Sequence, residues 1–410
     1  MKHLAIIGSG ISGLSASLIL HKKYKITLFE ASSKLGGHTN TIVTPNGIPI
    51  DTGFIVFNEK NYPNFCKFLS VLGVESIPSN MSFAYFDSGT NTGYSSDFPS
   101  GLFSTKKHII SPSFYKFLAD ITAFNALANQ QLDTIDPSIS IYDFLRTHKL
   151  SDRLINEYVL PMGAAIWSTS QHDTQAFPAK SFLSFWNNHG LLQLFNRPKW
   201  RTIKGGAQTY IDAVLKTTGL TYKCNHPIDR IERTEDAVTL FSKSSGPTDF
   251  DGVVIATHAD QALAMLSSPT PIERQLLRPW AYSKNHTVLH TSSSIVPKNK
   301  SAWASWIYTR HQDNQMSASY WMNRLQALHT ETQHFVTLNS HNTIPESSII
   351  YQTNYEHPKM TSESLSTQPK LDALNGQLNT YFCGSYFGYG FHEDGIASSI
   401  NVGQHLKCTL

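Results

Sequence analysis

The sequence predicts an α/β protein with two domains, the first of which combines segments that lie far apart in the chain. Short, mostly apolar runs at 3–7, 24–29 and 250–257 are typical of parallel strands that are buried on both faces. From about residue 282 to residue 355 apolar and polar residues alternate instead, which indicates antiparallel strands. At 410 residues the chain is also too long for one compact core. We therefore expect a parallel sheet in one domain, and a mixed or antiparallel sheet with helices in the other.

A glycine-rich turn follows the first apolar run. Gly8, Gly10 and Gly13 lie between this strand and an expected helix. The first glycine permits a tight turn, the second lets the backbone approach a pyrophosphate, and the third lets the helix pack close to the sheet. Backbone N–H groups at the start of the helix, at Ile11 and Ser12, would face the negative phosphates. This turn predicts a phosphate-binding site.

An acid ends the second predicted strand. Glu30 lies close to the spacing of about 20 residues after Gly8 that is expected for an acid that binds the adenosine ribose of a dinucleotide. We place Ala31 beside it in the same site. A carboxylate there also repels a 2′-phosphate, so NADP is not expected. Strand, glycine turn, helix, strand and acid together predict a Rossmann-like dinucleotide-binding unit.

A second glycine pair just past this acid indicates that the bound dinucleotide is FAD and not NAD. The segments 36–39 and 51–54 resemble the superfamily of FAD-dependent amine oxidases, protoporphyrinogen oxidases and phytoene desaturases. In that superfamily the pair lines the ribityl and phosphate part of FAD, and a later glycine passes close to the flavin ring. Where the superfamily flanks the pair with arginines, this chain has Lys34 and His38. The resemblance implies cofactor contacts from Gly36, Gly37, His38, Thr39, Gly53 and Phe54.

Later segments complete the FAD site by the same resemblance. An isoleucine near Pro227, either Ile228 or Ile231, is expected to contact the adenine end, and the strand at 250–257 ends in small residues close to the dinucleotide. A C-terminal strand ends in glycine, and the last helix is expected to point its N-terminus at the flavin, where it favours the negative charge of the reduced ring. The implied contacts are Ile228, Ala256, Thr257, Gly384, Asp394, Gly395 and Ile396.

The Rossmann-like FAD-binding domain is therefore expected to be discontinuous, of the GR2 type. We assign 1–75, 200–265 and 376–410 to it, and 76–199 and 266–375 to a substrate-binding domain. The chain would thus cross between the two domains several times.

The loop before the last helix carries the candidate catalytic residues, Tyr389, His392 and Glu393. Aligned back from Gly395, Tyr389 and His392 take the places where amine oxidases hold aromatic residues beside the flavin. Imidazole is a poorer face for a substrate amine, which weakens the amine-oxidase interpretation. His392, next to Glu393, could instead serve as an acid or a base, with the two residues tuning each other, or His392 could cap the loop backbone. Only Lys284 loosely matches the lysine that many amine oxidases hold near flavin N5.

Composition and the placement of the cysteines argue against several other kinds of partner and site. The net charge of +3 is small and no block of Lys or Arg stands out, so nucleic acid is not an expected partner. The cysteines are dispersed, which argues against a metal site or a disulfide framework and favours a reducing, cytoplasmic compartment. None lies in a context for covalent flavin attachment, so FAD is expected to bind noncovalently. No run approaches the roughly 18 apolar residues of a membrane span, while peripheral membrane contact stays open.

Five phrases extend the resemblance over essentially the whole chain. The segments 36–41, 51–59, 160–167, 256–260 and 386–395 are similar to a narrower group of NAD/FAD-binding oxidoreductases associated with cyclopropane-type fatty-acyl methyltransferases. This similarity implies flavin redox chemistry on an unsaturated or methylated acyl chain, with such a methyltransferase as a partner. The expected function is hydride transfer between a substrate C–H and flavin N5. An amine oxidase and a non-catalytic flavin-binding scaffold for a lipid methyltransferase are the alternatives.

Apolar side chains agree with a lipid-like substrate. The segment 160–167 is either a pocket wall or plain core, and aromatic residues on 302–310 and 317–323 either line the substrate or pack the sheet. A third set suits an entrance for an acyl chain with an anionic head, or a helix docked on the other domain. This set consists of Phe182, Phe185, Trp186, Leu191, Leu192 and Phe195, followed by Arg197, Lys199 and Arg201.

Overall fold

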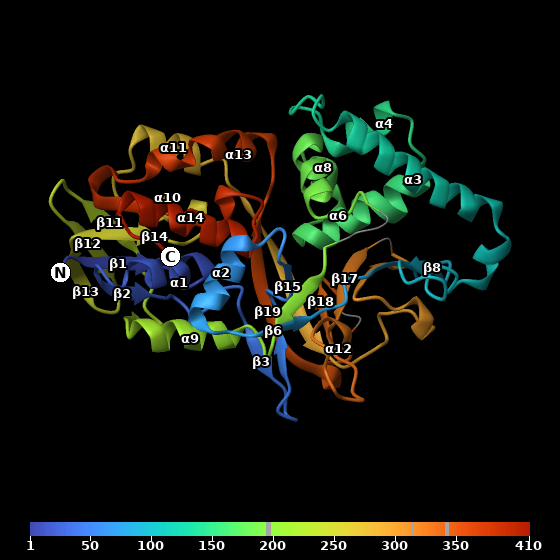
Figure 1. Cartoon of the computed structure of the whole chain (residues 1–410), viewed down its shortest axis with the longest axis horizontal. Coiled ribbons are helices and arrows are strands. Elements are labelled where there is room, and N and C mark those ends of the chain that lie inside the picture. The colour runs from blue at the N-terminus through green and yellow to red at the C-terminus, as the bar shows by residue number, and fades with distance from the viewer. Residues whose placement is uncertain (194–197, 314, 341–343) are drawn as a thin grey trace.

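Two large sheets organise the molecule (Figure 1). The computed structural model describes residues 1–193, 198–313, 315–340 and 344–410. Phe195 and Arg197, two members of the predicted acyl-chain entrance, lie outside the described residues. Both chain ends lie on the side of the smaller sheet (Figure 1).

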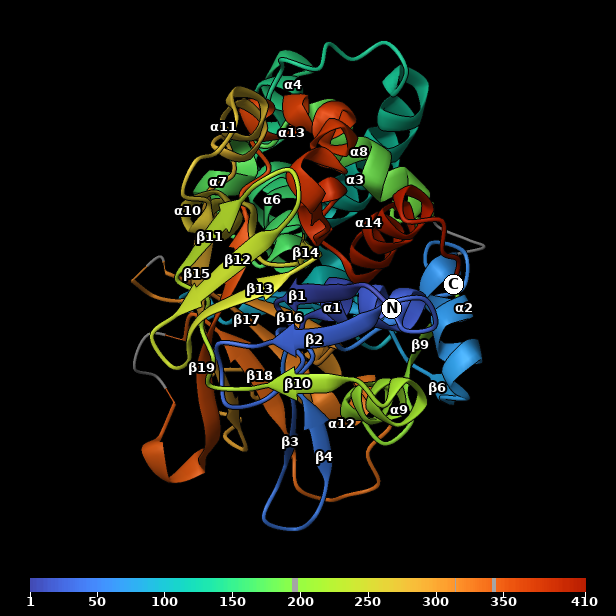
Figure 2. The ribbon, with the colours of Figure 1, turned by 90° about the vertical axis from the view of Figure 1, so that its left-hand side faces the viewer.

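The smaller sheet has five parallel strands in the order β10-β2-β1-β14-β20 (Figure 2). Ile7 at the end of β1 is in register with Phe29 of β2 and Ile255 of β14. The segments that follow these strands therefore leave the sheet at one edge. The strands are β1 (His3–Ile7), β2 (Lys25–Phe29), β10 (Thr221–Lys223), β14 (Gly252–Ile255) and β20 (Thr380–Phe382).

Helices and a small antiparallel sheet pack around the parallel sheet. Every residue of α1 (Ile11–Leu20) is buried, and α14 (His392–His405) packs against it. A Cβ built on Gly395 would lie 2.7 Å from Ser12 Oγ, so this glycine allows the two helix N-termini to touch. The other elements here are α2 (Pro63–Leu72), α9 (Gln208–Thr218), β11 (Arg230–Arg233), β12 (Val238–Ser242) and β13 (Gly246–Phe250).

The larger sheet has seven strands in the order β19-β15-β18-β17-β16-β7-β8. All neighbours are antiparallel except β16 and β7, which are parallel. This mixed sheet, together with the parallel one, confirms the predicted fold class. Its strands are β7 (Phe83–Asp87), β8 (Thr92–Ser95), β15 (Tyr282–His290), β16 (Trp306–Arg310), β17 (Met316–Trp321), β18 (Phe335–Leu338) and β19 (Ile349–Pro358).

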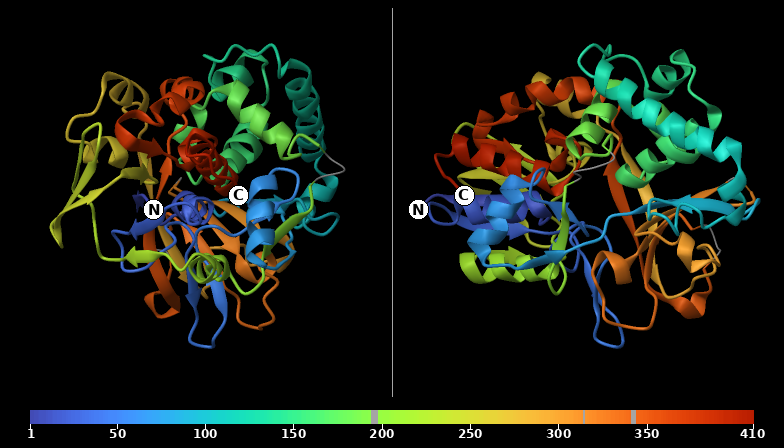
Figure 3. Two further views of the ribbon diagram at one scale, coloured as in Figure 1. Left: turned by 60° about the vertical axis from the view of Figure 1, so that its left-hand side comes forward. Right: turned by 45° about the vertical axis from the view of Figure 1, so that its right-hand side comes forward.

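A group of helices, green and teal in Figure 3, gathers beyond one end of the larger sheet. Ser111 and Ser140 cap two of them, because their hydroxyl groups accept bonds from the backbone N–H groups of Phe114 and Asp143. None of the described helices is long and apolar enough to cross a membrane. The group comprises α3 (Pro112–Gln131), α4 (Ile141–Thr147), α5 (Asp152–Leu154), η2 (Ile155–Val159), α6 (Leu160–Trp167), α7 (Gln171–Gln175) and α8 (Ala179–Asn188).

Short elements connect these layers. They are β3 (Thr41–Val43), β4 (Pro49–Asp51), β5 (Phe57–Asn58), β6 (Ser76–Pro78), β9 (Trp200–Ile203), η1 (Lys106–Ile110), α10 (Ala259–Met265), α11 (Pro271–Leu277), η3 (Lys300–Ala302), α12 (Met322–Leu325), η4 (Glu346–Ser348), α13 (Ser362–Thr367), η5 (Gln368–Leu374), η6 (Gln377–Asn379) and η7 (Ser385–Phe387).

Candidate active site

A cavity of about 1110 Å³ lies between the edge of the parallel sheet and the larger sheet. Most of the residues proposed from the sequence line it. These are Gly8, Gly10, Ile11, Ser12, Glu30, Ala31, Gly37, His38, Gly53, Phe54, Ile228, Ala256, Thr257, Gly384 and His392. The other proposed residues are not part of its lining: Gly13, Gly36, Thr39, Tyr389, Glu393, Asp394, Gly395 and Ile396.

The glycine turn forms a cradle of bare backbone at one end of the cavity. Gly8 has φ +97°, and a Cβ on it would lie 2.7 Å from Ala256 O. A Cβ on Gly37 would lie 3.2 Å from Gly10 Cα, so the two glycine segments touch. A Cβ on Gly10 meets nothing within 4 Å, because this residue faces open cavity at the start of α1. The cradle thus has the space and the N–H groups that a pyrophosphate requires.

The carboxylate of Glu30 is fixed at the cavity wall by neighbouring groups. It accepts hydrogen bonds from Ser9 N at 3.1 Å, from Ser9 Oγ, and from Ser32 N and Oγ at 2.8 Å each. Glu30 also lines the cavity next to Ala31. Its position on the wall suits the expected contact with a ribose hydroxyl.

His392 is held rigidly at the first turn of α14. Its ring stacks on Phe54 with centroids 3.6 Å apart, and its Nε2 lies 3.0 Å from Tyr210 Oη and 3.2 Å from Thr39 Oγ1. Burial lowers the pKa of His392 to about 3, so the imidazole is neutral near pH 7. Thr39, which the sequence assigned to the cofactor, thus contacts His392 and is not part of the lining. Tyr210 was missed, because its position on α9 gave no signal beyond the need of a buried hydroxyl for a partner.

Glu393 contacts α2 and not His392. Its Oε1 accepts bonds from Asn64 N at 3.1 Å and Asn64 Nδ2 at 2.7 Å, and its Oε2 accepts one from Phe65 N at 2.9 Å. The carboxylate therefore satisfies free N–H groups at the start of α2. Burial is the cause of the lowered pKa of His392, to which Glu393 makes no contribution.

Asp394 folds the loop before α14. Its Oδ2 accepts a bond from Phe391 N at 2.9 Å, and a Cβ on Gly388 would collide with its carboxylate. Burial raises the pKa of Asp394 to about 7. The hydrogen bonds from backbone N–H groups of this loop have the opposite, smaller effect and lower the pKa. Phe391 of this loop lines the cavity, whereas Tyr389 is not part of the lining and its ring lies 5.6 Å from that of Phe185.

A cluster of imidazole rings on the cavity wall was not predicted. The ring of His38 lies 5.1 Å from that of His357 on β19 and 6.3 Å from that of His258, which follows β14. His258 Nδ1 is 3.5 Å from a carboxylate oxygen of Glu356. Burial and the neighbouring His357 and His258 hold the pKa of His38 well below its usual range. His38 Nε2 is buried without a hydrogen-bond partner in the described part of the chain, so it is available to a ligand.

Tyr355 of β19 joins the two sheets beside this cluster. Its ring stacks on His38 with centroids 5.1 Å apart. Its hydroxyl lies 2.7 Å from Thr52 Oγ1 and accepts a bond from Asn40 Nδ2 at 2.8 Å. The larger sheet is thus fixed to the segment that carries the second glycine pair. No group of His, Cys, Asp and Glu with metal-binding geometry occurs among the described residues.

The far half of the cavity, which we call the substrate half, is apolar. Met162, Ala165 and Ile166 show that α6 forms part of its wall, while Phe182 and Trp186 are fully buried in the core. The charged residues of the described cavity lining are Glu30, Lys34, Asp229 and Glu356, and none of them belongs to the set that we assign to this half. The lining is Val56, Tyr62, Met81, Ser82, Phe83, Tyr94, Ser96, Tyr158, Met162, Ala165, Ile166, Ser168, Phe185, His189, Leu191, Trp200, Trp306, Tyr320, Leu338 and Phe391.

A parallel sheet with a phosphate cradle at its edge, opening into an apolar cavity, defines a dinucleotide-dependent oxidoreductase. Comparison with known families is more specific. Residues 11–296 match the model of the flavin-containing amine oxidoreductase family, and the chain belongs to this family. The protein is therefore an FAD-dependent oxidoreductase. The glycine cradle, Glu30 and the unpartnered His38 Nε2 fit this cofactor.

Several enzymes of known structure share this fold, and their names indicate different substrates. A putrescine oxidase with a redesigned cofactor site superposes with a TM-score of 0.72 at 12% identity, covering 99% of this chain and 98% of the other. A fatty acid isomerase from P. acnes gives 0.69 at 14% identity, covering 99% and 98%. The cyclohexylamine oxidase of Brevibacterium oxydans IH-35A gives 0.69 at 17% identity, covering 99% of each chain. At these identities the similarity shows the fold.

Proposed function

We propose that this enzyme transfers a hydride between a C–H bond of a fatty-acyl chain and flavin N5. The apolar substrate half of the cavity supports the proposal, because its described lining has aromatic and aliphatic side chains and no ionic ones. Such a wall binds an acyl chain by burying it, at about 25 cal/mol for each Å² of apolar surface. The sequence resemblance adds that the acyl chain of the substrate is unsaturated or methylated. A fatty-acyl methyltransferase would be the partner that supplies this substrate.

The cofactor supplies the hydride acceptor or donor, and the protein supplies position and dryness. Gly8 to Ser12 would bind the pyrophosphate, Glu30 the ribose, and His38 a polar group of the cofactor through Nε2. Phe54 and His392, which stack on each other and are both uncharged near pH 7, also line the cavity. Met162, Ile166 and Phe391 would exclude water from the reacting C–H.

A substrate amine fits this site less well. An ammonium group taken out of water needs a carboxylate or a pair of aromatic faces. The substrate half has no carboxylate among its described lining residues, and Tyr389, predicted for such a pair, is not part of the lining. Aromatic faces such as those of Phe185, Trp306 and Tyr320 do line this half, so the preference for an uncharged substrate rests on the carboxylate that its described lining lacks.

Anaerobic absorbance spectroscopy tests the proposal. The FAD-loaded protein is mixed with phospholipids that carry saturated, unsaturated or methylated chains, and separately with putrescine and cyclohexylamine. We expect a lipid to bleach the flavin band, or to restore it after reduction by dithionite. Bleaching by an amine alone would replace the proposal with amine oxidation, and exchange with neither class would indicate a scaffold.

Noncovalent attachment of FAD is part of the same proposal. The described lining of the cavity includes no cysteine. Flavin absorbance that moves to the supernatant after denaturation is the expected result, whereas absorbance retained on the chain would contradict it.

A further inference from the structure

Exposed apolar side chains are concentrated in one segment of the chain. Phe98, Ile109, Ile110 and Tyr115 are 78%, 53%, 84% and 49% exposed. They are four of the nine large apolar side chains exposed in the described part of the chain. Single exposed apolar residues are ordinary, whereas a concentration of them marks an interaction surface. The segment forms the right-hand edge of the molecule in Figure 1, far from the parallel sheet.

A rigid base holds these side chains outward. His108 is buried and stacks on Phe114 with centroids 3.9 Å apart and an interplanar angle of 11°. Tyr115 Oη donates a bond to Ile109 O at 2.9 Å, and Ser111 caps α3. Ile109 and Ile110 therefore project from a fixed turn, η1, and their exposure is a feature of the fold.

Positive charge accompanies the apolar side chains. Lys106, Lys107 and Lys116 are exposed, and residues 98–119 include no Asp or Glu. Asn299 Nδ2 donates a bond to Ser104 O at 3.0 Å, which places the loop with two further exposed lysines beside the segment. These lysines are Lys298 and Lys300.

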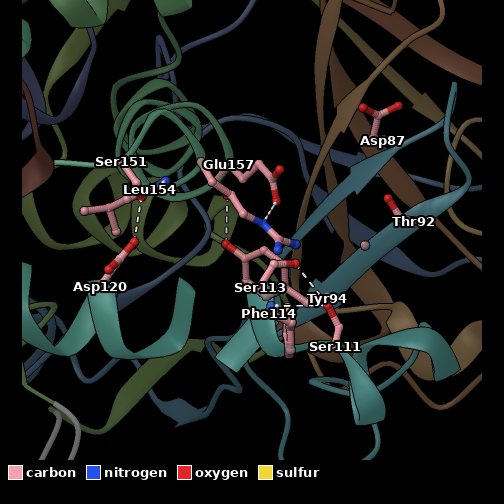
Figure 4. A network of polar contacts seen from close by, with 12 residues as sticks. Asp87, Thr92, Tyr94, Ser111, Ser113, Phe114, Asp120, Ser151, Leu154 and Glu157 are labelled. Atoms are coloured by element: carbon pink, nitrogen blue, oxygen red, sulfur yellow. Dashed lines mark hydrogen bonds and ion pairs between the residues drawn. The ribbon is translucent and has the colours of Figure 1, made fainter. Parts of the chain in front are cut away.

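One of the two acids that flank the segment has a cationic partner. Asp97 pairs with Arg324, and Asp120 accepts a bond from Ser151 Oγ at 2.7 Å (Figure 4). Arg324 therefore neutralises Asp97, whereas Asp120 bonds a neutral hydroxyl and keeps its charge. The segment presents an apolar and basic surface, which complements an anionic one.

One aromatic layer separates this surface from the substrate half. The rings of Phe114 and Phe117 lie 6.3 Å and 5.3 Å from that of Tyr94. Tyr94 lines the cavity, and its hydroxyl donates a bond to Glu157 O at 2.7 Å (Figure 4). The exposed turn therefore reaches the cavity wall through Phe114, on which His108 stacks.

We propose that Phe98, Lys106, Lys107, Ile109, Ile110, Tyr115 and Lys116, the 98–116 patch, bind the surface of an anionic lipid bilayer. Ile109 and Ile110 enter the boundary between headgroups and acyl chains, and the lysines meet the lipid phosphates. The inference rests on exposure and charge and does not depend on the substrate that the enzyme uses.

Vesicle cosedimentation of the FAD-loaded protein tests this surface without turnover. We expect binding to vesicles of phosphatidylglycerol and phosphatidylethanolamine, and at least tenfold weaker binding to pure phosphatidylcholine. High salt should weaken the binding, because it screens the lysines. Equal binding to both kinds of vesicle, or binding to neither, would overturn the proposal.

Paired variants locate the binding. Ile109→Ser/Ile110→Ser and Lys106→Gln/Lys107→Gln should each lower vesicle binding at least tenfold. Val43→Ser/Val71→Ser removes apolar side chains that are 64% and 51% exposed elsewhere, and Lys22→Gln/Lys216→Gln removes matched charge. An unchanged flavin spectrum shows that each variant is folded. Patch variants that bind vesicles as well as the control variants do would contradict the proposal. Light scattering that shows the wild type to be a dimer and Ile109→Ser/Ile110→Ser to be a monomer would also contradict it, because the patch would then be a dimer interface.

Discussion

The ring of His392 stacks on that of Phe54, with centroids 3.6 Å apart and planes 13° apart. His392 begins the last helix and Phe54 follows β4, so the stack joins an N-terminal segment to the last helix at the cavity. Tyr210 and Thr39 hold the imidazole from behind. Because the buried ring is neutral, the stability of the folded protein depends on pH.

His392 should make the protein less stable in acid. Its pKa is about 3 in the folded protein against 6.5 in the unfolded chain, so its contribution is complete above pH 6.5 and is lost as the pH falls toward 3. Between about pH 7 and about pH 5 this predicts a loss of about 2 kcal/mol in the free energy of unfolding. Urea unfolding of His392→Phe should show a smaller loss over that interval. Equal slopes in the two proteins would contradict the buried neutral imidazole.

Glu393→Gln should lower stability and leave the chemistry intact. The charged cap on α2 becomes a neutral one, at a cost of about 1–2 kcal/mol. Urea unfolding measures that loss, and stopped-flow absorbance measures the rate of flavin reduction. Glu363→Gln, in the first turn of α13, is the control. A large fall in the rate with normal stability would instead support the catalytic role predicted from the sequence.

Two alanine substitutions should separate folding from cofactor binding. A Cβ on Gly10 meets nothing within 4 Å and projects into the cradle, so Gly10→Ala should fold normally and bind FAD at least about tenfold more weakly. A Cβ on Gly13 collides with Gly8 O, so Gly13→Ala should lose stability itself. Fluorescence titration with FAD and urea unfolding report the two effects. Normal FAD affinity in Gly10→Ala would place the pyrophosphate elsewhere.

A carboxylate in the substrate half should abolish lipid turnover. Met162→Glu puts a charge on α6 against an apolar chain, and we expect a fall of about a hundredfold or more with FAD binding retained. Met162→Leu, which keeps apolar volume, should stay close to the wild type. Lipid turnover and the flavin spectrum are measured for both variants. Unchanged turnover in Met162→Glu would move the acyl chain away from this wall.

Local sequence signals led to several residues that the fold brings together on the cavity wall. Gly8, Gly10 and Glu30 belong to one short unit whose spacing is set by the strand and helix between them, and all three line the cavity. Phe54, Ala256 and Gly384 followed from family resemblance and also line it.

Roles that depend on distant partners escaped prediction. Glu393 lies next to His392 in the chain, yet its partners are Asn64 and Phe65 on α2. The cluster of His38, His258 and His357 combines three segments that meet only in the folded protein. Periodicity reports which face of an element is buried and does not report which element covers it.

The central claim is that electrons pass between the flavin and an acyl chain, and mass spectrometry tests it most directly. The FAD-loaded protein is incubated anaerobically with phospholipids while the flavin absorbance is followed, and the acyl chains are then analysed. We predict that one acyl chain loses or gains a pair of hydrogens in proportion to the flavin reduced or reoxidised. Acyl chains of unchanged mass, together with flavin that is reduced by amines, would contradict the account.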